Sequence, residues 1–359
     1  MGTNYIYNSD KIKDILVDDI IIGKELYSYK DKPSRANIVV ETGDVLFAKM
    51  QNSIKVICIN ETNKNYIYST GFYCLKDERI LPEYLKYYFL SKEFNIKKDN
   101  LCQGATMKAL NDNGLEQIEI EVPSISEQKR IVAIIDSLYS IIKLKNKQLD
   151  LLDELIKSRF VELFGDPETN PKGFKKVLLS DIAEYFNGLT YSPDNVSDNG
   201  TVVLRSSNIQ NSQLDFADTV RVDCPIKEKL YVKDNDILMC SRNGSARLVG
   251  KVALIKNLAE PMSFGAFMMI VRSKYYPYLM TYFQMEAFRR QIATGATTTI
   301  NQITGNMLNK ISLPLPEMLE VNQFAAFVEQ TDKSKSVCLE KIEKYTELYN
   351  KLMNDYFGG

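Results

Sequence analysis

The sequence predicts an α+β protein with two repeated β-rich domains, each followed by a long helix, the two helices packing as an antiparallel coiled coil. Three observations predict this fold. A heptad pattern of apolar residues runs through residues 126–164, which contain neither Gly nor Pro. Short β-like runs with turns precede that pattern. The same order of elements then occurs again, about 192 residues later along the chain.

The composition is that of an ordinary globular protein and argues against several functional classes. The 359 residues are 45% hydrophobic and 25% charged, with a net charge of -1, so two domains are expected and no global basic excess indicates nucleic acid. Basic patches can still form on a neutral chain. Because the chain has no His, His-based catalysis and Cys/His zinc sites are excluded, and we interpret its six scattered cysteines as reduced. Without an apolar run of membrane-spanning length, we expect a cytoplasmic protein.

The first β-rich domain is expected over residues 1–124. Apolar runs of strand length predict strands at 37–40, 45–48, 55–59, 71–75 and 118–122. Residues 82–94 read as one amphipathic helix with Pro82 in its first turn. A polar loop, 104–113, separates this helix from the last strand. A central spacer helix, 125–165, follows.

The second β-rich domain is expected over residues 166–316, and it repeats this order. Residues 178–186 look helical, and residues 277–292 form the counterpart of the first domain's helix. The expected strands are 202–206, 237–241, 250–255, 267–271 and 311–315. A second polar loop lies at 295–304, and a C-terminal spacer helix occupies 317–359.

Matching residues support the repeat. Asp44 and Asp236 are 192 residues apart, and the sequence GATMKALN at 104–111 faces GATTTINQ at 295–302. Two full copies would need about 25 residues more than the chain has. We assign this deficit to the start of the first copy, which is either shortened there or has its equivalent segment supplied differently.

The heptad seam explains how the two long helices pair. Its apolar members are Ile131, Ile135, Leu138, Ile142, Leu149, Leu152, Ile156 and Leu163. Lys145 and Arg159 interrupt it. A shift of 193 residues maps the seam onto the C-terminal helix, with Lys145 on Cys338. The second helix is therefore the natural partner of the first, and two repeated units would pack them antiparallel.

Several stretches resemble the specificity (S) subunits of type I restriction–modification systems. They are VKDNDILMCSRNGSARLVGKVAL (232–254), GATTTINQIT (295–304), ISLPLPEMLEVNQFAAFVEQTDK (311–333), VPSISEQKRIVAIID (122–136) and LFGDP (163–167). The resemblance covers nearly the whole chain. It implies that the β-rich domains are target recognition domains, each reading half of a split site in double-stranded DNA.

The same resemblance implies partners and the absence of catalysis. The helices would hold the domains apart and dock two adenine-specific methyltransferase subunits, and restriction subunits could then join. S-adenosylmethionine and ATP are expected on those partner subunits only, and no cofactor or metal on this chain. No catalytic constellation is apparent in the sequence.

Candidate DNA-binding residues lie in the polar loops, in the hairpins and after one strand. Hydroxyls and amides suit phosphates and base edges, whereas Lys and Arg suit phosphates. The candidates of the first copy are Lys49, Gln51, Asn52, Lys55, Thr106, Lys108 and Asn111. Those of the second copy are Arg205, Ser206, Ser207, Asn208, Arg242, Asn243, Arg247, Lys251, Thr297, Thr298, Thr299 and Asn301.

Structural roles compete with each of these assignments. The polar loops could cap helices, 204–210 could hold a salt bridge and an Asx turn, and the hairpins could simply be solvated. Two other functions also remain open: a recognition subunit of a system whose enzyme both methylates and cuts, or a non-DNA coiled-coil scaffold. Basic residues gathered on one face would favour DNA, and their dispersal would favour a scaffold.

Overall fold

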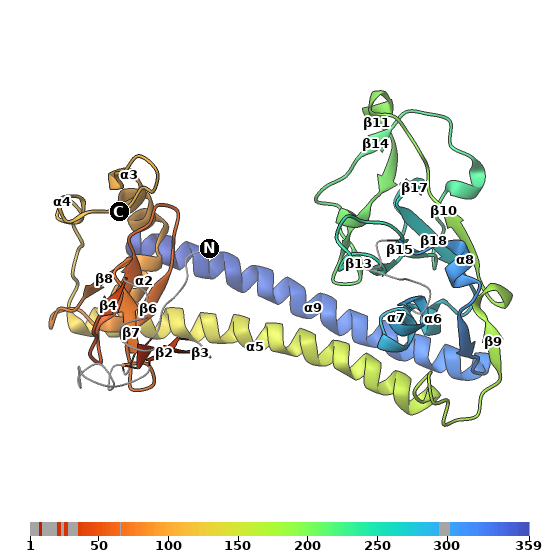
Figure 1. Cartoon of the computed structure of the whole chain (residues 1–359), viewed down its shortest axis with the longest axis horizontal. Helices are drawn as coiled ribbons and strands as arrows, with labels where there is room; N and C mark the ends of the chain where they lie inside the picture. The colour runs from red at the N-terminus through yellow and green to blue at the C-terminus, as the bar shows by residue number, and fades with distance from the viewer. Residues whose placement is uncertain are drawn as a thin grey trace. The chain divides into compact units, whose positions relative to one another are not determined.

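The chain folds into two compact units. The computed structural model describes residues 7–8, 20–22, 25–27, 35–64, 66–293 and 302–358. Unit 1 comprises Met1–Lys147 and Cys338–Gly359, and unit 2 comprises Gln148–Val337. Each unit therefore contains part of both long helices, α5 (Ile125–Phe164) and α9 (Met318–Phe357) (Figure 1).

The core of unit 1 is built on a three-stranded antiparallel sheet. Its strands, in spatial order, are β6 (Val56–Cys58), β5 (Val45–Ala48) and β8 (Phe72–Leu75). All four residues of β5 are buried, because the strand lies between two neighbours and its side chains pack on both faces of the sheet. The other described strands are β1 (Tyr7–Asn8), β7 (Tyr66–Ser69) and β4 (Ala36–Ile38), which form one sheet, and the paired β2 (Ile20–Ile22) and β3 (Glu25–Tyr27).

Two short helices cover this sheet where the sequence predicted one. They are α2 (Pro82–Leu90) and α3 (Lys92–Leu101). Ser91 lies between them in an extended conformation, and its Oγ accepts a hydrogen bond from the Phe94 amide at 3.2 Å. The predicted helix 82–94 is therefore wrong in its extent, because a serine cap ends one helix and starts another. A short helix, α4 (Asp112–Leu115), follows the polar loop.

Unit 2 has the same sheet with an added edge strand. Its strands, in spatial order, are β10 (Glu184–Asn187), β18 (Met268–Arg272), β15 (Ile237–Cys240) and β16 (Val252–Leu254). A second sheet holds β14 (Arg221–Val222), β11 (Val196–Leu204) and β17 (Met262–Phe264). Two further pairs are β12 (Ile209–Gln210) with β13 (Gln213–Leu214), and β19 (Ser312–Pro314) with β9 (Lys176–Leu178).

The helices of unit 2 also follow the repeat. They are α6 (Tyr276–Tyr282), α7 (Glu286–Ala293) and α8 (Gly305–Leu308), with 3-10 turns at η1 (Leu179–Asp181), η2 (Pro193–Asn195), η3 (Ser206–Asn208) and η4 (Glu228–Leu230). The predicted helix 277–292 is again two helices.

Two further sequence predictions of secondary structure are wrong. Residues 178–186, predicted helical, contain the end of β9, the turn η1 and most of β10. Pairing with β18 outweighs their helical pattern, and the turn places Leu179 fully in the core. Residues 118–122 form no strand, whereas their counterpart β19 in unit 2 is held as a strand by β9. In both cases a pairing partner decides the structure.

The repeat is present in detail at the start of each central strand. In unit 1, Asp44 Oδ2 accepts a hydrogen bond from the Glu41 amide at 2.8 Å. In unit 2, Asp236 Oδ2 accepts one from the Lys233 amide at 2.8 Å. Each aspartate follows a residue with positive φ, Gly43 at 94° and Asn235 at 72°. The two copies therefore enter their central strands through the same turn.

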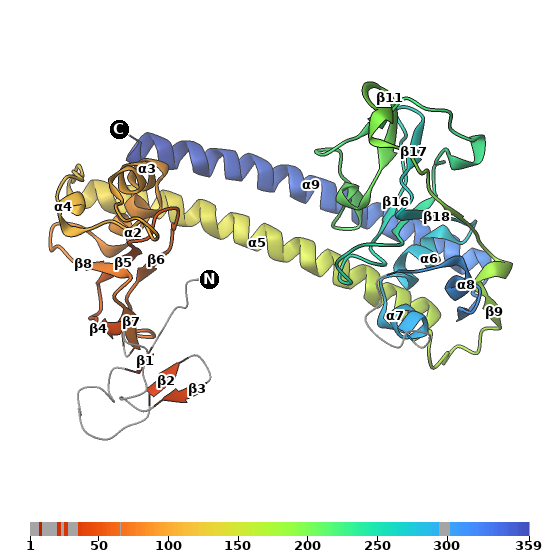
Figure 2. The ribbon, with the colours of Figure 1, turned by 45° about the horizontal axis from the view of Figure 1, so that its top comes forward.

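The two long helices pack antiparallel, as the heptad seam predicts. Early in α5, Ile131 and Ile135 join a cluster with Met353 and Phe357 at the end of α9. Late in α5, Phe160 packs on Phe324 near the start of α9, with ring centres 5.7 Å apart. Figures 1 and 2 show the two helices side by side.

The midpoint of the helix pair carries one further contact. The Lys145 carbonyl accepts a hydrogen bond from Cys338 Sγ at 3.3 Å. These are the two residues that the shift of 193 makes equivalent. The two helices therefore contact one another at equivalent positions of the repeat.

Gln128 ties the start of α5 to unit 1, and its replacement should be strongly destabilising. Its side chain is fully buried; Oε1 accepts from the Leu81 amide at 2.8 Å, and Nε2 donates to the carbonyls of Arg79 at 2.9 Å and Pro123 at 2.8 Å. In Gln128→Leu these three backbone groups lose their partner, so we expect the free energy of unfolding to fall by about 3 kcal/mol. Urea denaturation measures this change.

The matched control is Gln117→Leu. The Gln117 side chain is exposed, and its Nε2 donates a hydrogen bond to the Asn113 carbonyl at 2.8 Å. Its replacement should change the free energy of unfolding by no more than about 0.5 kcal/mol. Equal stability of the two variants would show that the Gln128 network does not hold the helix.

Candidate nucleic-acid interface

In unit 2 the three predicted DNA-binding segments meet beyond the end of β15. The Ile303 amide donates to the Ser241 carbonyl at 2.7 Å, and Arg242 forms an antiparallel bridge with Gln302. On the other side, Asn243 Nδ2 donates to Ser206 Oγ at 3.3 Å. The segment 204–210, the hairpin 240–251 and the end of the polar loop 295–304 therefore form one surface.

Some candidates lie outside the described residues. These are Thr297, Thr298, Thr299 and Asn301. The described chain resumes at Gln302, directly beside Arg242. Their assignment to DNA binding stays a prediction.

Unit 1 brings its own hairpin and polar loop together in the same way. Met50 forms an antiparallel bridge with Ala109. The Leu110 amide donates to the Lys49 carbonyl at 2.8 Å, and the Gln51 amide donates to the Lys108 carbonyl at 3.0 Å. The candidates Lys49, Gln51, Asn52, Lys55, Thr106 and Lys108 thus lie on two adjoining segments.

The two contacts are equivalent in the repeat. Met50 and Arg242 are 192 residues apart, and their bridge partners Ala109 and Gln302 are 193 apart. Both bridges join the residues just after the central strand to the end of the polar loop. The fold therefore builds the same polar surface twice.

Basic residues gather on this surface in unit 2. Arg242 and Arg247 are exposed, and the Arg242 guanidinium carbon lies 5.5 Å from the centre of the Phe267 ring. Lys251 Nζ donates to the Ile209 carbonyl at 3.1 Å, which joins the hairpin to the segment that carries Arg205. Because the segments with these cations contact one another, their arrangement favours a nucleic-acid interface over a scaffold.

The competing structural role holds for Asn208. Its side chain is 1% exposed; Oδ1 accepts from the Arg205 amide, and Nδ2 donates to the carbonyls of Asp215 and Asp218. The buried Asn208 amide is bonded to the backbone at both ends and cannot reach a DNA groove, so the assignment of Asn208 to DNA contact is corrected. Arg205 Nη2 lies 2.8 Å from both carboxylate oxygens of Asp218, the expected alternative salt bridge.

Asn111 and Ser207 have more limited roles than predicted. Asn111 is exposed, but its Oδ1 caps α4 by accepting from the Gly114 amide at 2.9 Å, and its Nδ2 donates to Gln103 Oε1. Thr304 caps α8 in the same way, through the Met307 amide. The Ser207 Oγ is buried and has no hydrogen-bond partner among the described residues. The capping alternative therefore holds at the end of both polar loops.

In unit 1 one cation of the hairpin lies over an aromatic ring. Lys49 Nζ is 4.0 Å from the centre of the Tyr73 ring, and the Tyr73 hydroxyl donates to Asp112 Oδ1 at 2.5 Å. Burial, and then the bond to Asp112, raise the pKa of Tyr73, so the phenol is neutral at physiological pH. The neutral ring supplies a cation–π contact that orients the Lys49 ammonium.

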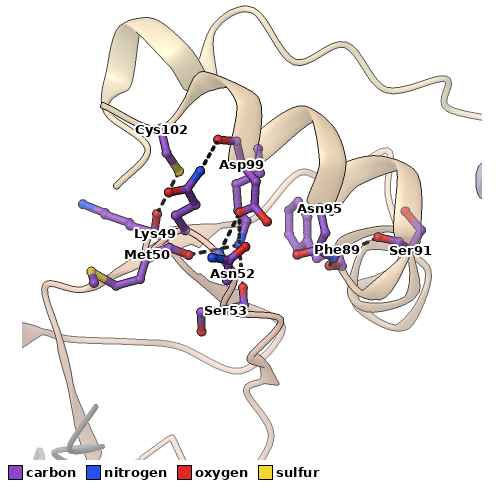
Figure 3. A network of polar contacts seen from close by, with 11 residues as sticks. Lys49, Met50, Asn52, Ser53, Phe89, Ser91, Asn95, Asp99 and Cys102 are labelled. Atoms are coloured by element: carbon purple, nitrogen blue, oxygen red, sulfur yellow. Dashed lines mark hydrogen bonds and ion pairs between the residues drawn. The ribbon is translucent and has the colours of Figure 1, made fainter. Parts of the chain in front are cut away.

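Sequence reasoning missed four residues that contact these hairpins. Phe267, the first residue of a predicted strand, is 60% exposed beside Arg242. Lys98 and Arg289 reach the hairpins from the short helices α3 and α7. Asp99, also on α3, reaches the hairpin of unit 1 (Figure 3). The repeat places a cation at equivalent positions of the two copies, Lys98 and Arg289, and this match could have indicated a shared role.

Other kinds of site were also sought. Among the residues that the structure describes, no group of three or more Cys, Asp or Glu side chains could hold a metal ion. In the same part of the chain, no helix has the length and apolar character needed to cross a membrane.

Comparison with known proteins identifies the family. Residues 3–154 and 171–348 each match the family model described as type I restriction modification DNA specificity domain. The type I restriction enzyme EcoKI specificity subunit of Escherichia coli (strain K12) is 23% identical over 310 residues, covering 78% of this chain and 67% of that protein. The StySPI specificity subunit of Salmonella potsdam is 24% identical over 317 residues, covering 78% and 66%. The chain thus spans about two thirds of the length of these two relatives.

A third relative matches over a longer stretch. The type I restriction enzyme MjaVIII specificity subunit of Methanocaldococcus jannaschii is 23% identical over 351 residues, covering 90% of this chain and 80% of that protein. None of these matches indicates a catalytic family.

Two solved structures support the fold. One, from work on complex assembly and conformational transition of the type I R-M system, has a TM-score of 0.59 at 20% identity and covers 99% of this chain and 92% of its own. The other, a type I restriction–modification S subunit from M. genitalium, has a TM-score of 0.54 at 14% identity and covers 88% and 83%. With two family matches that together span most of its length, this chain belongs to the type I restriction–modification DNA specificity family, whose domain it carries twice.

Proposed function

We propose that this chain is the specificity subunit of a type I restriction–modification system. It would read a bipartite site in double-stranded DNA, one half-site per unit, without catalysing a reaction itself. The observation that carries this proposal is the repeated meeting of hairpin and polar loop, at Met50 with Ala109 and at Arg242 with Gln302. A protein that reads two half-sites needs two such surfaces.

The side chains on these surfaces suit DNA. Lys49, Lys55, Arg242 and Arg247 would contact phosphates and position each unit. Gln51, Asn52 and Asn243 carry the amide groups that can pair with base edges in the major groove. Thr106, Lys108, Ser206 and Lys251 adjoin them.

Partner subunits would supply the chemistry. We propose that two adenine-specific methyltransferase subunits dock on α5 and α9, that restriction subunits join them, and that S-adenosylmethionine and ATP bind to these partners. Exposed apolar residues occur at equivalent positions of the two helices, Leu144 with Val337 and Leu155 with Leu348. Two equivalent apolar pairs support two copies of one partner.

The same helices would also act as spacers between the two half-sites, and the complex would act on DNA in the cytoplasm. The long helices join the two DNA-reading units in sequence. A helical connection without Gly or Pro is a stiff one.

Selection from a random library of DNA duplexes tests the proposal. The chain would be purified with its methyltransferase subunits and used to capture duplexes, which are then sequenced. We expect enrichment of one motif with two fixed parts separated by unspecified bases. A non-DNA scaffold would enrich no motif, and this result would refute the proposed function.

A further inference from the structure

We infer that Lys98 and Asp99 in unit 1, and Arg289 in unit 2, are positioning residues that hold the DNA-reading hairpins from behind. This inference rests on the proposed function and goes beyond it. It assigns half-site specificity in part to side chains that lie on the supporting helices α3 and α7. These residues would touch no base themselves.

Lys98 is a buried cation beneath the hairpin that joins β5 to β6. Its side chain is 1% exposed, and Nζ donates to the carbonyl oxygens of Met50, at 3.2 Å, and Ser53. Nζ also lies 3.3 Å from Asp99 Oδ1. A buried ammonium is tolerated only when oxygens surround it, so both ends of this turn are fixed to α3 by one side chain.

Asp99 fixes the tip of the same hairpin. Its Oδ1 accepts a hydrogen bond from the Asn52 amide at 3.0 Å, and its carbonyl accepts one from Gln51 Nε2 at 3.2 Å. Asn52 has φ of 63°, in the left-handed region that Asn tolerates better than most residues. The conformation that presents the exposed Asn52 side chain is therefore held by Asp99.

Figure 3 shows that the support comes from one helix. Asp99 lies on α3 and Cys102 directly follows it, and both face Lys49 and Asn52 of the hairpin. Cys102 Sγ is 3.6 Å from the Lys49 carbonyl. The backbone on both sides of the turn is thereby bonded to the last turn of α3 and to the residue that follows it.

Unit 2 has the corresponding contact with a different residue. Arg289 lies on α7, 191 residues after Lys98, and its Nη1 donates to the Val249 carbonyl at 2.7 Å in the hairpin between β15 and β16. The next residue, Gly250, has φ of 80°, and a Cβ there would lie 3.4 Å from Arg289 Nη1. The hairpin backbone therefore lies directly against the guanidinium.

The equivalence argues for positioning and against chance packing. Two helices at the same place in the repeat send a cation to the backbone of the hairpin that they support. The neighbouring cations differ: Lys97 pairs with Glu93 on its own helix, and Arg290 is exposed and pairs with Glu168 at 2.8 Å. Lys97 and Arg290 therefore serve as matched controls.

Genome methylation in cells that express the chain with its methyltransferase subunits tests the inference. Asn52→Ala first identifies which half-site unit 1 reads. Lys98→Met and Asp99→Asn should then lower discrimination at that half-site by about tenfold, the effect of one lost base contact, and leave the other half-site unchanged. Arg289→Met should do the reverse. Lys97→Met and Arg290→Met should change neither, and Lys98→Arg should retain most discrimination.

Each alternative outcome is distinct. Loss of discrimination at both half-sites in proportion to a lowered melting temperature would mean a merely structural role and overturn the inference. Unchanged motifs in Lys98→Met and Arg289→Met would overturn it too. Absence of any motif in the wild type would instead refute the proposed function.

A measurement without DNA separates the two claims further. Hydrogen exchange of the amides at 50–55 should be at least about tenfold faster in Lys98→Met than in Lys97→Met, with equal melting temperatures. Equal exchange in the two variants would show that Lys98 does not position the hairpin, whatever the function of the chain.

Discussion

Replacing Arg242 and Arg247 together with Gln will weaken DNA binding by the assembled complex about 10- to 100-fold at physiological salt. Both side chains are exposed on the surface where the three candidate segments of unit 2 meet. Each phosphate contact that is lost also removes about 0.9 from the slope of the logarithm of affinity against the logarithm of salt concentration, so the slope should fall by about 2.

Fluorescence anisotropy over a series of salt concentrations measures both quantities. Arg290→Gln is the matched control, because Arg290 is exposed in the same unit but pairs with Glu168. It should change neither affinity nor slope. If the double variant binds with an unchanged slope, the hairpin 240–251 does not lie against DNA phosphates.

Introducing Glu at Leu144, Leu348, Leu155 and Val337 will prevent assembly with the methyltransferase subunits. These side chains are between 43% and 65% exposed, and each buried Leu or Val would contribute about 1.5–3 kcal/mol to an interface. Four charges in apolar contacts should therefore abolish binding. Leu144 and Leu348 lie in unit 1, and their equivalents Val337 and Leu155 lie in unit 2. Leu144→Glu with Leu348→Glu should therefore leave one subunit bound, and Leu155→Glu with Val337→Glu should leave the other.

Native mass spectrometry counts the bound subunits. Ser140→Glu with Ser336→Glu provides the control, since both serines are exposed polar residues of the same helices. That variant should assemble fully. A complete complex formed by the fourfold variant would show that the methyltransferase subunits dock elsewhere.

The repeat and the helix pair could be predicted because both depend on patterns within the sequence. The heptad seam names Ile131 and Ile135, which are buried against the end of α9. The match of Asp44 with Asp236 reflects a shared turn at the start of each central strand. Such features need no knowledge of distant partners.

Element boundaries failed where tertiary partners decide them. Ser91 divides a helical pattern because its hydroxyl caps the next helix. Residues 184–187 form a strand in spite of the helical pattern there, because they pair with β18. Neither effect is visible in local periodicity.

The segments that form the candidate interface could be chosen from the sequence, but the residues that support them could not. Hairpin and loop residues could be chosen by polarity. For Asn208 and Lys98, however, the residue type does not tell whether the side chain contacts DNA or supports the fold. The Asn208 amide has the chemistry of a base-reading group, but it is hydrogen-bonded to the backbone instead. Lys98 lies beyond the predicted helix 82–94 and has the residue type of a surface cation, yet it is buried beneath the hairpin.

The boundaries of the two repeats stay predictions. The two family matches start 168 residues apart, at 3 and 171, and end 194 apart, at 154 and 348. The expected shortening of the first copy lies outside the described residues. The predicted limits are 1–124, 125–165, 166–316 and 317–359.

Sequencing of methylated adenines in a host that lacks other restriction–modification systems tests the central claim most directly. The chain would be co-expressed with its methyltransferase subunits, and the methylated positions mapped across the genome. Two units with equivalent DNA-reading surfaces predict one motif with two specific parts, separated by a fixed number of unspecified bases. A single continuous motif, or no methylation, would contradict this account.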